Sequence, residues 1–188
     1  MGIIIFGASG AGSTTLGKEV AQRLNCQYLD IDDYLWCWNT AVPLTVVRTR
    51  KERAEHLLED IKKYPKFVIA GTIFNDRGLF EPFFDLAVFI STPAAVCAER
   101  VRAREFARWG ERVIPGGDMY KVTRFHGDAG DYLATAQGYE TANVSKFSRK
   151  LHEKWIADMT CPILRIDGMD DFLENADLVV SQFNKEIV

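Results

Sequence analysis

One short segment near the start of the chain constrains the fold more than any other. The stretch at residues 7–15, with the sequence GASGAGSTT, follows an apolar run at residues 3–6 and leads into a helical pattern. A strand, a glycine-rich loop and a helix in this order bind phosphate through backbone amides and the helix N-terminus. The residues expected to contact a bound phosphate are Gly7, Ser9, Gly10, Ala11, Gly12, Ser13, Thr14 and Thr15.

One position in this loop departs from the usual pattern. The residue after the last glycine is normally lysine, and this chain has Ser13. A hydrogen bond to a charged group contributes about 1.5–3 kcal/mol, so the missing lysine bears on catalysis more than on the fold. We expect nearby arginines to supply the positive charge. Thr14 keeps the hydroxyl that would ligate Mg²⁺.

Apolar runs and helical periodicities alternate along the rest of the chain. Strands are expected at residues 2–6, 27–31, 67–70, 86–90 and 163–166, and helices at 16–24, 54–61, 93–108, 147–159 and 172–183. This alternation predicts a parallel sheet covered by helices on both faces. A length of 188 residues with 47% hydrophobic content suits a single domain over residues 1–188.

A segment at about 109–145 interrupts the alternation. It contains Pro115-Gly116-Gly117 and then a mixed polar and aromatic stretch of weak periodicity. An insertion between a helix and the last strand is where a lid over a binding site would lie. A packed helical insertion without that role is the alternative.

Composition argues against several classes of partner. The formal net charge is −3, so no global basic field favours nucleic acid. No apolar run approaches the length of a membrane span, and the four cysteines lie far apart without a CxxC pair. We therefore expect a cytoplasmic protein, a monomer or a homodimer, that binds a small molecule and neither nucleic acid nor membrane.

Acidic residues follow the second strand. Asp30, Asp32 and Asp33 stand at its carboxyl end, the edge where ligands bind in open α/β sheets. In a strand, Asp30 and Asp32 share one face because the side-chain period is two. Phosphoryl transfer would use Asp30 to hold Mg²⁺ through water and Asp32 as a base for the acceptor hydroxyl. The alternative is a turn or helix cap, a role expected most for Asp33; Trp36 either stacks on the acceptor or packs in the core.

Arginines recur along the helix that precedes the insertion. Arg100, Arg104 and Arg108 are four residues apart and form one helix face. A solvated face paired with acidic neighbours is the ordinary explanation. The position at the entry to the insertion favours contact with phosphate, because guanidinium groups fit phosphate oxygens and can stack on a base.

These features resemble the nucleoside-monophosphate kinase group of P-loop proteins, which includes adenylate and shikimate kinases. The resemblance implies a three-layer α/β fold with a five-stranded parallel sheet in the order 2-3-1-4-5 and a helical lid insertion. In adenylate kinases the first arginine of an RxxxR pair lies near adenine and the second meets phosphates, roles that would fall on Arg100 and Arg104. The acids Asp30 and Asp32 are similar to the DxD of shikimate kinases, where the first serves magnesium and the second holds the acceptor hydroxyl. Gly168 ends a sequence similar to the loop that borders the adenine pocket.

A closer resemblance is to a poorly characterised bacterial kinase-like family with a lysine-free Walker A loop. Its members often read GASGxGxTTL at the phosphate loop and RxxPGGDMY at the lid, and this chain has GASGAGSTTL at 7–16 and RVIPGGDMY at 112–120. Arg149 would be the arginine that returns from the lid. The chain lacks the DGFPR of adenylate kinases after the third strand, so AMP is not the expected acceptor. There Gly71 would permit close substrate approach, and Arg77 either contacts an anionic group or is solvated.

The leading hypothesis is an ATP- and Mg²⁺-dependent phosphotransferase acting on a nucleotide, a nucleoside or another small hydroxylated metabolite. Asp32, Arg100 and Arg104 would carry catalysis. A second hypothesis, favoured by Ser13, is a nucleotide-binding regulator without useful catalysis. A third and less favoured hypothesis is a sulfotransferase, which the absence of an evident catalytic histidine near the loop or the second strand argues against.

Overall fold

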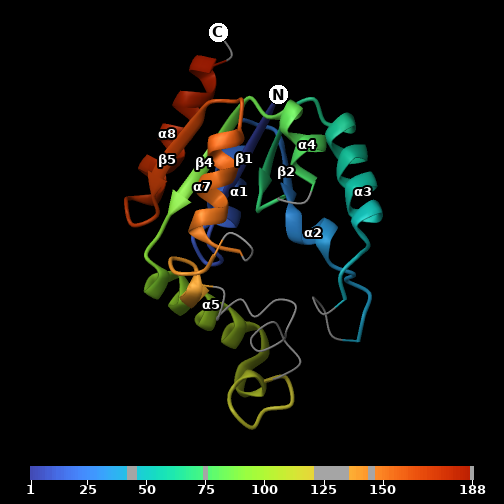
Figure 1. The fold of residues 1–188 in the computed structure, drawn as a ribbon, viewed down its shortest axis with the longest axis vertical. Coiled ribbons are helices and arrows are strands. Elements are labelled where there is room, and N and C mark those ends of the chain that lie inside the picture. The colour runs from blue at the N-terminus through green and yellow to red at the C-terminus, as the bar shows by residue number, and fades with distance from the viewer. Residues whose placement is uncertain (42–45, 74–75, 121–135, 144–146, 187–188) are drawn as a thin grey trace.

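Five parallel strands form the centre of the computed structural model, which describes residues 1–41, 46–73, 76–120, 136–143 and 147–186 (Figure 1). The strands are β1 (Gly2–Gly7), β2 (Gln27–Asp30), β3 (Phe67–Ala70), β4 (Leu86–Ser91) and β5 (Ile163–Asp167). Their order in the sheet is β2-β3-β1-β4-β5, which confirms the predicted order. The central strand β1 is buried along its whole length, as its unbroken apolar sequence predicts.

The strand register places the predicted site residues together at the carboxyl ends of the parallel strands. Gly7 at the end of β1 pairs with Ile90 of β4, and Ile5 pairs with Ala70 at the end of β3. Asp30 at the end of β2 also pairs with Ala70. The phosphate loop and the acids after β2 therefore lie at the same, carboxyl end of the sheet, and the end of β3 lies between them.

Helices cover both faces of the sheet (Figure 1). They are α1 (Ser13–Arg23), α2 (Ile31–Leu35), α3 (Arg50–Lys63), α4 (Arg77–Phe80), α5 (Ala94–Trp109), α7 (Arg149–Asp158) and α8 (Phe172–Glu186), with 3-10 turns η2 (Glu81–Phe83) and η3 (Gly110–Val113). Alternate residues of β1 divide the core: Ile3 and Ile5 pack with α1, α5 and α8, whereas Ile4 and Phe6 pack with α3, α4 and α7. The three layers agree with the predicted fold class.

Capping side chains fix the starts of α3 and α7. Thr49 and Glu52 form a capping box at the start of α3, and the hydroxyl of Ser148 accepts from the backbone N–H of Leu151 at the start of α7. In α7 this cap places Arg149 in the first turn. No helix in the described ranges is both long enough and apolar enough to cross a bilayer.

The predicted elements differ from the structure at short segments. The strand expected at 27–31 ends at Asp30, and α2 begins at Ile31. The short helix α4 and the two 3-10 turns were not predicted from the periodicity. Within the predicted insertion the structure describes residues 109–120, which include η3, and residues 136–143, while residues 121–135 and 144–146 lie outside the described ranges. The lid function of this segment stays a prediction.

Candidate functional site

The phosphate loop is a sharp turn between β1 and α1. Gly10 and Gly12 have φ angles of 88° and 110°, which side chains other than glycine rarely adopt. At Gly10 an added Cβ would lie 2.4 Å from the carbonyl oxygen of Cys97, so α5 approaches the loop too closely for any side chain there. Gly12 is the N-cap of α1, and no side chain among the described residues caps this helix. The N–H groups of its first turn can therefore bind an anion.

Arg100 of α5 donates hydrogen bonds to the backbone of the phosphate loop. Its Nη1 donates to the carbonyl oxygens of Ala11 and Gly10 at 3.3 and 3.5 Å, and its Nη2 donates to the carbonyl oxygen of Gly168 at 3.3 Å. The hydroxyl of Thr92 donates to Ala11 as well, at 3.2 Å. Because these contacts bind the carbonyl ends of the loop peptides, they stabilise the turn without occupying the N–H groups. Arg100 thus joins the two loops that the resemblance assigns to nucleotide binding.

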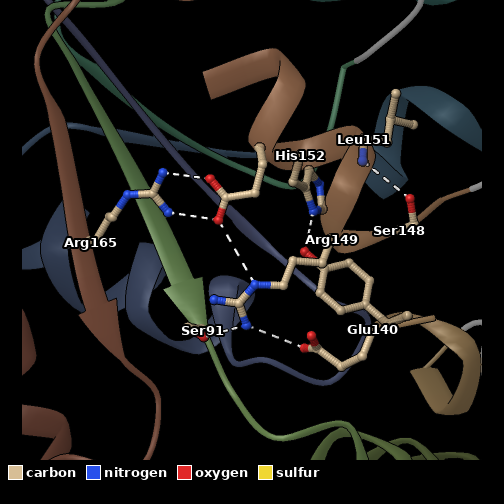
Figure 2. A network of polar contacts seen from close by, with 9 residues as sticks. Ser91, Glu140, Ser148, Arg149, Leu151, His152 and Arg165 are labelled. Carbon is tan, nitrogen blue, oxygen red and sulfur yellow. Dashed lines mark hydrogen bonds and ion pairs between the residues drawn. The ribbon is translucent and has the colours of Figure 1, made fainter. Parts of the chain in front are cut away.

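Arg149 brings a second guanidinium to the C-terminal end of β4 (Figure 2). Its Nη1 lies 3.2 Å from the hydroxyl of Ser91 and 3.3 Å from a carboxylate oxygen of Glu140. Its Nε lies 3.8 Å from the carboxylate of Glu153. Ser91 directly follows the β4 residue that pairs with Gly7. The guanidinium therefore stands beside the start of the phosphate loop.

Thr14 and Asp30 meet where Mg²⁺ was predicted. The hydroxyl of Thr14 is 3.5 Å from Oδ2 of Asp30, which also accepts from the hydroxyl of Tyr28 at 2.8 Å. Burial raises the pKa of the Asp30 carboxyl, while hydrogen bonds from the Asp32 N–H and the Tyr28 hydroxyl lower it. Mg²⁺ typically takes one or two protein oxygens and completes its shell with water and phosphates. The donor set fits that pattern, and no three His, Cys, Asp or Glu side chains of the described residues could form a metal cluster.

Asp32 does not extend the strand, so the prediction that it shares a strand face with Asp30 is wrong. Asp30 caps α2 by accepting the backbone N–H of Asp32 at 3.0 Å, and Asp32 is the second residue of that helix. The expected cap, Asp33, does not have that role. An aspartate that accepts the N–H two residues later stabilises a helix start, and this local bond ends the strand.

Trp36 is a core residue in this structure. Its side chain is 4% exposed, and its indole N–H donates to Oδ1 of Asp32 at 3.1 Å. Trp36 also forms an isolated antiparallel bridge with Val47. Of the two predicted roles, core packing is the one observed, and the buried ring holds Asp32 in place.

Arg104 and Arg77 contact acids of the protein. Nε of Arg104 lies 3.3 Å from the carboxylate of Glu105, which is 1% exposed and also lies 3.5 Å from Arg108. Arg77 donates to Asp158 at 2.9 Å and thereby joins α4 to α7. The predicted arginine face is therefore divided, since Arg100 contacts the phosphate loop while its two neighbours contact Glu105. Ligand contact by Arg104 or Arg77 stays a prediction.

The end of β3 holds a residue that the sequence pattern missed. A Cβ on Gly71 would lie 2.8 Å from Cβ of Ile31, so this glycine lets α2 pack against the strand end. The next residue, Thr72, has its hydroxyl 3.1 Å from Nε2 of His152, which is 0% exposed. His152 occupies an inward position of α7, where periodicity alone predicts an ordinary core residue. Arg53 of α3 was also missed; its Nε is buried without a hydrogen-bond partner among the described residues.

A polar groove of about 550 Å³ runs beside β2. The described residues that line it supply four carboxylates, from Asp30, Asp33, Glu59 and Asp60, and the guanidinium of Arg48. No residue of the phosphate loop belongs to its lining. Asp30 therefore borders this groove on β2 and also contacts Thr14 of the phosphate loop.

Sequence comparison decides the family. No protein-family model matches the chain. Over 178 residues it is 35% identical to the uncharacterised protein YqaC of Bacillus subtilis (strain 168), and the match covers 95% of this chain and 94% of that protein. The chain belongs to the YqaC family. That name carries no activity, so the function of this YqaC family member has to be argued from its site.

Solved kinase structures share the fold of this YqaC family member. The shikimate kinase of Aquifex aeolicus superposes with a TM-score of 0.55 at 14% identity, covering 100% of this chain and 98% of that chain. The deoxyadenosine kinase of M. mycoides superposes with a TM-score of 0.52 at 14% identity, covering 98% and 100%. The YqaC family member therefore has the P-loop kinase fold, as the sequence resemblance implied. Identity at this level transfers the fold and no substrate.

Proposed function

We propose that this protein is an ATP- and Mg²⁺-dependent phosphotransferase that acts on a nucleotide, a nucleoside or another small hydroxylated metabolite. The observation that carries the proposal is the phosphate loop, whose glycine turn is fastened by Arg100 and whose Thr14 lies 3.5 Å from Asp30. The proposal includes a cytoplasmic location, a small-molecule acceptor rather than nucleic acid or membrane, and a monomer or homodimer.

Each residue has a proposed role. The amides of the loop bind the ATP phosphates, while Thr14 and, through water, Asp30 hold Mg²⁺, which neutralises charge on the transferring group. Asp32 takes the proton of the acceptor hydroxyl. The oxygen of this hydroxyl then bonds to the γ-phosphorus of ATP, and ADP departs as the leaving group. Arg100 keeps the loop in shape, and Arg149 supplies positive charge in place of the missing lysine. Arg104 remains a proposed contact to the phosphates.

Calorimetric titration with ATP and Mg²⁺, followed by turnover on a panel of nucleosides, nucleotides and sugars, tests the proposal. We expect ATP to bind, more weakly without Mg²⁺, and one acceptor class to be phosphorylated. Asp32→Asn should lower turnover by about 10²- to 10⁴-fold with ATP affinity retained, since it removes a general base. A wild-type protein that binds no ATP refutes the proposal.

A nucleotide-binding regulator is the second candidate, because Ser13 replaces the usual lysine. It predicts tight ATP binding, no turnover on the panel and no effect of Asp32→Asn on ATP binding.

The variant Ser13→Lys tests whether the phosphate site lacks positive charge. If Arg149 already fills the role, ATP affinity should change by less than about threefold, whereas a gain of about tenfold or more, worth about 1.4 kcal/mol, means a deficient site.

A further inference from the structure

A buried chain of hydrogen bonds joins three separate parts of the sequence. His152 of α7 lies between Thr72, just after β3, and Tyr139, in the turn that follows the segment 121–135. Its Nε2 is 3.1 Å from the hydroxyl of Thr72, and its Nδ1 is hydrogen-bonded to the hydroxyl of Tyr139. His152 is 0% and Tyr139 2% exposed, while Thr72 is half-buried. Figure 2 shows His152 on the same helix as Arg149.

Packing does not require polar groups at this place. Aromatic rings surround the imidazole, with centroids 5.0 Å away at Phe147, 5.3 Å at Phe6, 5.8 Å at Phe89 and 6.4 Å at Trp155. Apolar side chains of the same shape can replace a buried hydrogen-bonded set at little loss of stability. A buried polar network in such surroundings instead fixes the direction of each group. The group with remaining capacity is the half-buried one, Thr72.

The chemistry of the three groups decides where the protons lie. Burial lowers the pKa of His152 to about 3, so the ring is neutral, with one donor and one acceptor nitrogen. Burial also raises the pKa of Tyr139, which keeps its proton, and a phenol donates more strongly than an alcohol. These donor strengths favour the tautomer in which Tyr139 donates to Nδ1 and Nε2–H donates to the oxygen of Thr72. In this tautomer the hydroxyl proton of Thr72 is available to a ligand.

Thr72 lies at the carboxyl end of the sheet, where ligands bind in open α/β folds. It follows β3, the strand that lies between β1, which leads into the phosphate loop, and β2, which ends at Asp30. We propose that Thr72 is a specificity-determining contact that donates a hydrogen bond to an oxygen of the phosphoryl acceptor, and that His152, held by Tyr139, is the positioning residue that orients it. This inference rests on the proposed phosphotransferase function and restricts the acceptor to compounds with a hydroxyl, carbonyl or ring oxygen near the reacting group.

The ring proton can be tested without any ligand. NMR of protein labelled with ¹⁵N-histidine should give a neutral His152 ring with its proton on Nε2 from pH 5 to pH 8. Tyr139→Phe should shift the Nδ1 resonance, because it removes the hydroxyl that donates to this nitrogen. A proton on Nδ1 in the wild-type protein overturns the assignment, since Thr72 would then donate to His152 and not to a ligand.

Acceptor kinetics test the role of Thr72. Thr72→Val keeps the side-chain shape without the hydroxyl, and we expect it to raise the acceptor KM about three- to tenfold with kcat and ATP affinity near wild type. His152→Phe should raise KM by a similar factor. Thr72→Ser, which keeps the hydroxyl, should have the KM of the wild-type protein. An unchanged KM in Thr72→Val, or an equal loss of ATP affinity, overturns the inference. Failure of the wild-type protein to bind ATP instead refutes the proposed function, and the ring-proton measurement still decides the assignment to His152.

Discussion

Gly10 is the loop residue at which substitution should do most harm. Alanine at position 10 would need a φ of 88°, and its Cβ would lie 2.4 Å from the carbonyl oxygen of Cys97. Alanine at position 12 would need a φ of 110°, but no described atom lies within 4 Å of its Cβ. We expect Gly12→Ala to lower the free energy of unfolding by about 1–2 kcal/mol, and Gly10→Ala to lower it further. Urea denaturation of both variants measures the difference. Equal losses would mean that the contact with α5 is relieved without strain.

Single residues differ in how well the sequence predicts them. The loop glycines and Thr14 could be predicted because backbone binding of phosphate demands a fixed spacing after a strand. Asp30 lies next to Thr14, but Asp32 was assigned to the wrong local structure. His152 could not be predicted, because Thr72 and Tyr139, to which it is hydrogen-bonded, lie 80 and 13 residues away, and only the tertiary fold brings them together.

The caps of α3 and α7 form a matched pair of tests at the scale of the element. Ser148→Ala and Thr49→Ala should each lower the free energy of unfolding by about 1 kcal/mol, because each leaves a first-turn N–H without its acceptor. Only Ser148→Ala should also weaken ATP binding, since Arg149 lies in the first turn of α7. Thermal denaturation and ATP titration of both variants check this. Equal ATP affinities of the two variants would mean that Arg149 does not contact ATP.

Elements were predictable where burial imposes a long pattern. The strands and the helices α1, α3, α5, α7 and α8 have apolar residues at regular spacing, and each was expected near its observed position. The five-residue helix α2 was missed because it is too short to show a period, and its start depends on one side-chain bond from Asp30. A strand prediction naturally continued through that segment.

The stability of the whole molecule should depend on pH through His152. The pKa of this residue is lowered to about 3 in the folded protein, from 6.5 in the unfolded chain, so only the unfolded state gains a proton as pH falls below 6.5. The free energy of unfolding should therefore decrease on acidification, by about 2 kcal/mol between pH 7 and pH 5 from this group. Urea denaturation of the wild type and of His152→Gln at both pH values isolates the contribution. The same slope in both proteins would contradict it.

The hydroxyl of Ser13 has a practical consequence for finding this protein in a cell extract. Nucleotide reagents that acylate the loop lysine of kinases meet no amine at position 13, and they leave the protein unlabelled there even when it binds ATP as proposed. Chemical surveys of ATP-dependent enzymes built on that reaction will undercount proteins of this kind. Photoaffinity labels that attach through the base, independent of any nucleophile in the loop, are the appropriate reagents.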